Sequence, residues 1–113
     1  LSLLCHFVYS IELDTKLARS AAERLHPLGY QNIEIHQGDG QNGLIAYAPF
    51  DKIIAACAVP TLPTSWIKQL KNPGIGVAPV GSAAEQILYK IKKNVHGETT
   101  LEQDIACVFV PLI

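Results

Sequence analysis

The sequence predicts a three-layer α/β sandwich whose sheet is mostly parallel and ends in a C-terminal antiparallel hairpin. Apolar strand-like runs alternate with helical repeats or long loops over residues 7–80, and two more such runs follow Gln86 with no helix-length segment between them. The composition, 49% hydrophobic and 17% charged residues, is typical of a packed domain. At 113 residues, the chain fits one domain.

A strand, a helix and a second strand are predicted in the first forty residues. Residues Phe7–Ile11 are nearly all apolar, as expected of a strand buried on both faces. Asp14 is a candidate helix cap, and Asn32–His36 alternates as a strand before Gly38-Asp39-Gly40. The helix has apolar residues at three- to four-residue spacing and is stopped by Pro27 and Gly29; these apolar residues are Leu17, Ala21, Leu25 and Leu28.

The remaining elements follow a loop that ends at Phe50. The continuous apolar stretch of Asp51–Cys57 predicts a third, central strand, and a short helix is expected over Thr64–Leu70. After that helix we expect a turn, a weak strand and two strands that pair as a hairpin around Asn94–Gly97. These segments are Asn72–Gly76 for the turn, Val77–Val80 for the weak strand, and Ile87–Ile91 and Ile105–Val110 for the hairpin.

Several classes of function are disfavoured by composition. Cys5, Cys57 and Cys107 lie far apart among apolar neighbours, which indicates buried reduced thiols, and no metal site is expected from the scattered histidines. The basic cluster Lys90–Lys93 has no interleaved aromatic residues, so a solvated hairpin explains it better than nucleic-acid binding. The apolar run at Leu1 is too short to span a membrane and has no signal-peptide pattern, so we expect a cytoplasmic protein.

Two acidic residues follow neighbouring strands of the predicted sheet. Glu12 comes at the carboxyl end of the first strand, where an acid can accept hydrogen bonds from the ribose hydroxyls of an adenosine cofactor. Asp39 lies between two glycines after the next strand, where it could bind the adenine amino group. Each has a plainer interpretation: Glu12 as a solvated acid favoured by the helix dipole, and Asp39 as part of an ordinary turn.

A glycine-rich loop normally precedes the ribose-binding acid of a nucleotide-binding sheet by about 20 residues. Only residues 1–11 precede Glu12, and none of them is glycine. The sequence also contains no Met and opens on Leu1 within an apolar run. We therefore expect that it starts within a domain and that the first strand of the sheet and the glycine-rich loop are missing from it.

Seven short motifs occur in an order that resembles the protein-L-isoaspartate O-methyltransferase family. They are Val8–Glu12, Gly38–Gly40, Ala48–Asp51, Ala58–Pro60, Gln69–Lys71, Pro79–Gly81 and Phe109–Leu112. The resemblance covers nearly the whole chain. It implies a Rossmann-like methyltransferase fold of which this chain is a part, and S-adenosyl-L-methionine as the cofactor.

The resemblance also implies a substrate and the residues that contact each ligand. The substrate would be the free α-carboxylate of isoaspartyl residues in damaged proteins, and the methyl ester would then collapse to a succinimide. Glu12 would bind the ribose, Asp39 with Gly38 and Gly40 the adenine side, and Ala58-Val59-Pro60 would border the acceptor pocket. No catalytic acid or base is expected, because a carboxylate is already ionised near pH 7.

The chain departs from the family pattern at one turn, and two alternatives remain open. Lys71-Asn72-Pro73-Gly74 stands where the family has Lys-Pro-Gly-Gly, and Ile75-Gly76 follows in place of Arg-Leu. A degenerate or truncated module of the same fold would have no catalytic activity. A nicotinamide-dependent oxidoreductase would also carry an acid after its second strand, but the Gly-Asp-Gly turn and the Ala-Val-Pro loop fit it poorly.

Overall fold

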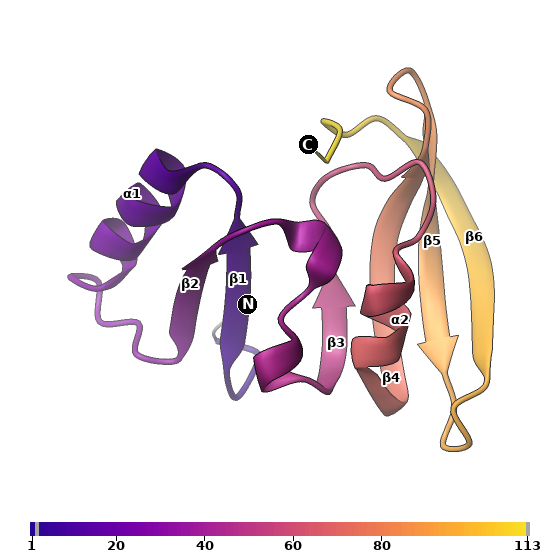
Figure 1. Ribbon diagram of the computed structural model, residues 1–113, viewed down its shortest axis with the longest axis horizontal. Helices are drawn as coiled ribbons and strands as arrows, with labels where there is room; N and C mark the ends of the chain where they lie inside the picture. The colour runs from indigo at the N-terminus through magenta and orange to yellow at the C-terminus, as the bar shows by residue number, and fades with distance from the viewer. Residues whose placement is uncertain (2, 113) are drawn as a thin grey trace. The chain divides into compact units, whose positions relative to one another are not determined.

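The computed structural model describes residues 1 and 3–112. The chain divides into two compact units, Leu1–Gly40 and Gln41–Ile113. Within the described residues, strands β1 and β2 form a sheet in the first unit, and the second unit has a sheet with the order β3-β4-β5-β6 (Figure 1).

The first unit is a parallel strand pair joined by a helix. Strand β1 (Val8–Glu12) pairs with β2 (Ile33–Gln37) without a register shift, and α1 (Thr15–Leu25) connects them. Asp14 caps α1 as predicted, because its Oδ1 accepts hydrogen bonds from the backbone N–H groups of Lys16 and Leu17 at 2.8 and 3.0 Å.

The buried face of α1 differs from the predicted apolar stripe. Ala18 is the buried residue of the helix, Ala21 and Leu25 are half-buried, and Leu17 is 59% exposed. The helix ends at Leu25, so Leu28 lies beyond it. The face turned inward is therefore centred on Ala18 rather than on Leu17.

The second unit begins with two short 3₁₀ helices, η1 (Gly40–Asn42, whose first residue belongs to the first unit) and η2 (Ile45–Tyr47). They are followed by β3 (Phe50–Ile54), α2 (Thr64–Gln69), β4 (Leu70–Gly81), β5 (Gln86–Lys93) and β6 (Thr99–Cys107). Strands β3 and β4 are parallel, whereas β4-β5 and β5-β6 are antiparallel. The sheet is therefore mixed rather than mostly parallel. Strand β3, predicted to be central, has β4 as its one strand neighbour in the described part of the chain.

The predicted turn at Asn72–Gly76 is wrong, because these residues belong to the continuous strand β4. Gly74 pairs with Lys93 and Ile75 with Lys92, and β5 supplies partners for β4 from Gly74 to Gly81. Packing explains why a glycine occupies position 76 of this strand. A Cβ atom there would lie 3.2 Å from Cδ1 of the buried Ile91, so the glycine leaves room for that side chain.

The predicted antiparallel hairpin is confirmed, but its second strand lies earlier in the sequence. Strand β6 starts at Thr99, opposite Lys93, and ends at Cys107 rather than Val110. Turn hydrogen bonds around Asn94 close the hairpin, including Asn94 N to Glu98 O at 3.0 Å. This tight turn fixes the register, and residues 108–110 are left outside the sheet.

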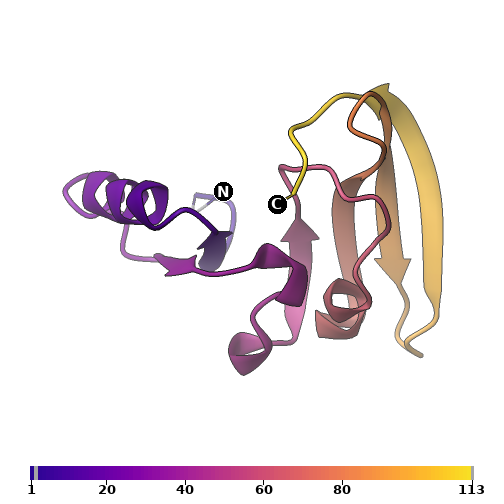
Figure 2. The same cartoon turned by 45° about the horizontal axis from the view of Figure 1, so that its top comes forward.

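Helix α2 lies over one face of the second unit's sheet (Figures 1 and 2), and its Trp66 belongs to the core of this unit. Val59, Trp66 and Ala78 are 2%, 6% and 1% exposed, and Leu112 packs against them. None of the helices described is both long and apolar enough to cross a membrane.

Candidate functional site

Glu12 and the Gly38–Gly40 segment lie side by side at the carboxyl end of the β1-β2 pair. Glu12 is paired with Gln37, and the next backbone N–H, that of Gly38, donates to Glu12 O at 3.0 Å. The ladder thus continues one bond past the last strand pair. The parallel register brings together the residues that the sequence predicted at the ends of neighbouring strands.

Glu12 is half-buried, and its carboxylate already accepts one hydrogen bond. Its Oε1 accepts a hydrogen bond from the backbone N–H of Asp14 at 3.2 Å. The helix-capping role belongs to Asp14, so Glu12 does not serve as the cap. A carboxylate has about four acceptor positions, which leaves capacity for the two hydroxyls of a ribose. Gln37 holds the backbone after Glu12, since its Nε2 donates to Leu13 O at 2.7 Å.

The turn after β2 has room next to its first glycine. A Cβ atom built on Gly38 would meet no atom within 4 Å apart from those of its two chain neighbours. Asp39 follows and is exposed. The space next to the Gly38 backbone is therefore not filled by residues from elsewhere in the chain.

The Ala58-Val59-Pro60 segment, which we call the acceptor loop, lies in the second unit and is more buried than a typical loop. Ala58 is 4% and Val59 2% exposed, while Pro60 is exposed. Val59 N donates to Pro79 O at 3.0 Å, and Gly81 N donates to Val59 O at 2.9 Å. The backbone here is fixed to the end of β4, and the side chain available to a ligand is that of Pro60.

The burial of two glutamines was not predicted from the sequence. Gln69 is 3% and Gln86 1% exposed, and the amide oxygen and nitrogen of each bond to backbone atoms. Gln69 accepts from Leu44 N and donates to Asn42 O, each at 2.9 Å. Hydrophobic periodicity counts Gln as a surface residue, so no pattern signal could have found them.

The carboxyl of Glu102, on the β5-β6 hairpin, has a perturbed pKa. The hydrogen bond from Lys92 Nζ, 2.9 Å from Glu102 Oε1, lowers the pKa of the Glu102 carboxyl, helped by the positive charges of Lys92 and Lys90. The two side chains are 45% and 48% exposed, so this is a surface ion pair and no part of the predicted site. Within residues 1 and 3–112, no group of His, Cys, Asp and Glu side chains is arranged to hold a metal ion.

Comparison with known proteins identifies the family. Residues 4–113 match the model of the protein-L-isoaspartate(D-aspartate) O-methyltransferase family. The chain is 45% identical over 107 residues to the protein-L-isoaspartate O-methyltransferase of Fervidobacterium nodosum, covering 94% of this chain and 53% of that protein. It is 46% identical over 107 residues to the enzyme of the same name from Pyrobaculum islandicum, covering 93% and 51%. The chain thus spans about half the length of these curated relatives.

Solved structures agree on the fold. A protein-L-isoaspartate O-methyltransferase structure superposes with a TM-score of 0.85 at 25% identity, covering 93% of this chain and 33% of that one. A Plasmodium falciparum structure that carries the family's name, solved with S-adenosyl-L-homocysteine, gives a TM-score of 0.81 at 20% identity, covering 95% and 52%. Because the family model matches residues 4–113 of this chain, the chain belongs to the protein-L-isoaspartate(D-aspartate) O-methyltransferase family.

Proposed function

We propose that this chain forms part of an S-adenosyl-L-methionine-dependent protein carboxyl O-methyltransferase that methylates isoaspartyl residues in damaged proteins. The observation that carries the proposal is the juxtaposition of Glu12 with Gly38-Asp39-Gly40 at one strand edge, in a chain of this family. The Plasmodium falciparum relative was solved with S-adenosyl-L-homocysteine, which supports a cofactor of this type.

The residues of the first unit fit the adenosine half of this cofactor. Glu12 would accept the ribose hydroxyls with the acceptor positions that Asp14 N leaves available. Asp39 would accept from the adenine amino group, and the ring would lie against Gly38, next to which no residue other than its chain neighbours comes within 4 Å of a built Cβ atom. No residue assigned here would bind the methionine half.

The proposed reaction requires correct orientation of the cofactor and the substrate more than it requires proton transfer. The cofactor would supply a methyl group attached to a positively charged sulfonium. The isoaspartyl carboxylate is ionised near pH 7 and is already a nucleophile, so no base is needed. The acceptor loop would contribute a fixed wall: Val59 is held to β4, and the exposed Pro60 would border the pocket.

The proposed partners are proteins and peptides that contain isoaspartyl residues, and the proposed compartment is the cytoplasm. The wide spacing of Cys5, Cys57 and Cys107 in the sequence, with no C-x-x-C pair, is typical of reduced thiols and supports this compartment. The thiols are less buried than expected, because Cys5 is exposed and Cys57 and Cys107 are half-buried.

Cofactor binding is tested by calorimetric titration of the chain with S-adenosyl-L-homocysteine. Glu12→Gln keeps the shape of the side chain but removes its charge, and we expect affinity to fall by about 1.5–3 kcal/mol for each charged hydrogen bond lost. Glu23→Gln, an exposed acid on α1, is the matched control and should not change affinity. Equal affinity for Glu12→Gln and the unmodified chain would contradict the assignment of the ribose site.

Activity is tested in a hybrid enzyme in which this chain replaces the matching half of the Fervidobacterium nodosum relative. The hybrid should transfer a labelled methyl group to an isoaspartyl peptide and not to its aspartyl isomer. Equal labelling of both peptides, or none by a hybrid that binds the cofactor, would contradict the proposed function.

A further inference from the structure

We infer that Gln86 is a positioning residue for the acceptor loop and acts through residues 108–112, here called the C-terminal segment. The inference rests on the proposed function, because that proposal assigns Ala58-Val59-Pro60 to the substrate pocket. All the residues involved belong to the second unit.

The side-chain amide of Gln86 is buried, and both its nitrogen and its oxygen make hydrogen bonds to backbone atoms. The residue is 1% exposed, Nε2 donates to Ser82 O at 2.6 Å, and Oε1 accepts from the backbone N–H of Phe109 at 2.7 Å. The thiol of Cys107 adds a weaker contact to Gln86 O at 3.7 Å. Only a side chain that carries a donor and an acceptor can satisfy Ser82 O and Phe109 N together.

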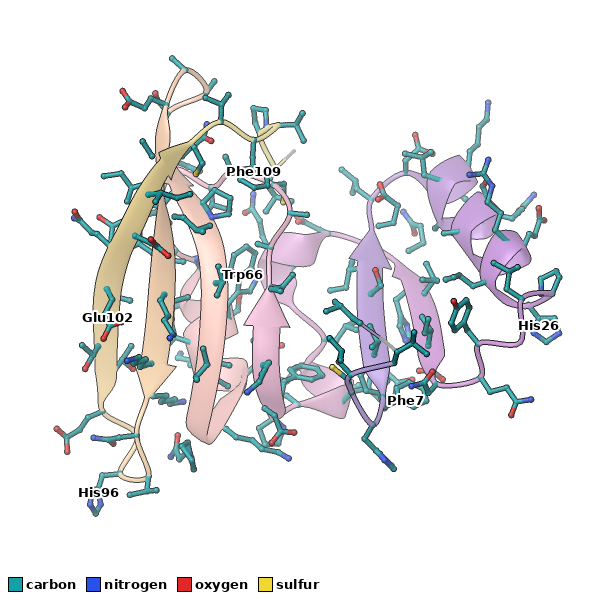
Figure 3. All side chains as sticks on the ribbon, turned by 180° about the vertical axis from the view of Figure 1, so that it is seen from behind. Phe7, His26, Trp66, His96, Glu102 and Phe109 are labelled. Atoms are coloured by element: carbon teal, nitrogen blue, oxygen red, sulfur yellow. The ribbon has the colours of Figure 1, made fainter. Side chains whose placement is uncertain are left out.

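The C-terminal segment leaves the sheet just before Phe109. Strand β6 ends at Cys107, and Val108 and Val110 are 72% and 71% exposed, whereas Phe109 between them is 37% exposed. Figure 3 labels Phe109 on this segment, above Trp66 in that view. Further along, Leu112 packs against the core cluster. The hydrogen bond from Phe109 N to Gln86 therefore restrains the backbone at the start of the segment, together with the partial burial of Phe109.

Both backbone groups of Ala58 depend on the C-terminal segment. Ala58 N donates to Val110 O at 2.8 Å, and Leu112 N donates to Ala58 O at 2.8 Å. The backbone groups of Val59 bond instead to β4. Loss of the Gln86 amide should therefore loosen the loop at Ala58 while Val59 stays attached, which displaces the pocket wall without unfolding the sheet.

The first test measures amide hydrogen exchange in the whole chain. Gln86→Leu removes both hydrogen bonds at similar volume, and we expect protection at Ala58 and Leu112 to fall by about tenfold more than at the amides that pair β4 with β5. Gln69→Leu makes the same chemical change at an equally buried site that holds Leu44 and Asn42, so it controls for lost stability. Unchanged protection at Ala58 in Gln86→Leu, or an equal loss in Gln69→Leu, would overturn the inference.

The second test uses a conservative variant whose effect depends on pH. The side chain of Gln86→Glu can donate to Ser82 O and accept from Phe109 N only while its carboxyl is protonated. Protection at Ala58, corrected for the intrinsic exchange rate, should therefore recover as the pH falls. Gln86→Leu should show no such recovery, and equal behaviour of the two variants would contradict the role assigned to the amide.

The third test separates this inference from the proposed function. In the hybrid enzyme, Gln86→Leu should raise KM for an isoaspartyl peptide by about tenfold and leave KM for S-adenosyl-L-methionine within about twofold. Equal changes in both constants would overturn the inference even if the enzyme is active. If the unmodified hybrid binds cofactor but methylates nothing, the proposed function fails, and the exchange measurements alone decide whether Gln86 holds the loop.

Discussion

Replacing Gly43 with alanine should destabilise the second unit, and the effect should depend on the presence of Gln69. Gly43 has a φ of +63°, in the left-handed region. A Cβ atom there would lie 2.7 Å from Cδ and 2.8 Å from Nε2 of Gln69. Because the amide of Gln69 is buried and bonded at both ends to residues on either side of Gly43, it cannot move aside and keep its hydrogen bonds.

The structure gives a magnitude for each change. Left-handed backbone costs an alanine about 1–2 kcal/mol. Each hydrogen bond of the Gln69 amide contributes about 0.5–1.5 kcal/mol net, so losing both costs about 1–3 kcal/mol. Gly43→Ala should therefore cost about 2–5 kcal/mol, because it combines the backbone strain with the displacement of Gln69. Gln69→Ala should cost about 1–3 kcal/mol.

In the double variant the clash is absent, because the Gln69 side chain has already been removed. Its cost should again be about 2–5 kcal/mol, which is less than the sum of the single changes by about 1–3 kcal/mol.

Urea unfolding of the four proteins measures this coupling energy. The fluorescence of Trp66 reports on the second unit, since it is the single tryptophan and is 6% exposed. A common buffer with trimethylamine N-oxide strengthens burial and gives the destabilised variants a folded baseline. If the costs of the single variants add to within about 0.5 kcal/mol, the reasoning from the Gly43–Gln69 contact is refuted.

Three further outcomes are expected. Asp14→Ala should lower the free energy of unfolding by about 0.5–2 kcal/mol through loss of the helix cap, measured by circular dichroism in urea; no change would refute the cap. Lys92→Ala should raise the pKa of Glu102 toward its ordinary value in an NMR titration. Because the folded-state pKa is depressed, the stabilisation from this pair is present at neutral pH and is lost as pH falls through that folded-state pKa. Asp39→Ala should weaken S-adenosyl-L-homocysteine binding in calorimetry, and unchanged affinity would remove Asp39 from the proposed site.

Local signals in the sequence were sufficient for the elements that carry the proposed cofactor site. The first strand, the cap at Asp14 and the second strand each depend on neighbouring residues, and the structure confirms them with boundaries shifted by about one residue. The pairing of Glu12 with the Gly38–Gly40 turn could also be predicted, because parallel strands bring their carboxyl ends to one edge.

Tertiary pairing decided the elements that hold the acceptor loop. The Asn72–Gly76 segment has the composition of a turn, but β5 supplies partners that keep most of it in β4. The apolar run that ends at Val110 reads as a strand, yet the tight turn at Asn94 sets the register of β6 and leaves residues 108–110 outside the sheet. Gln86 holds that segment through one buried amide. Such a bond depends on atoms 23 residues apart in the chain, and no local pattern of the sequence encodes it.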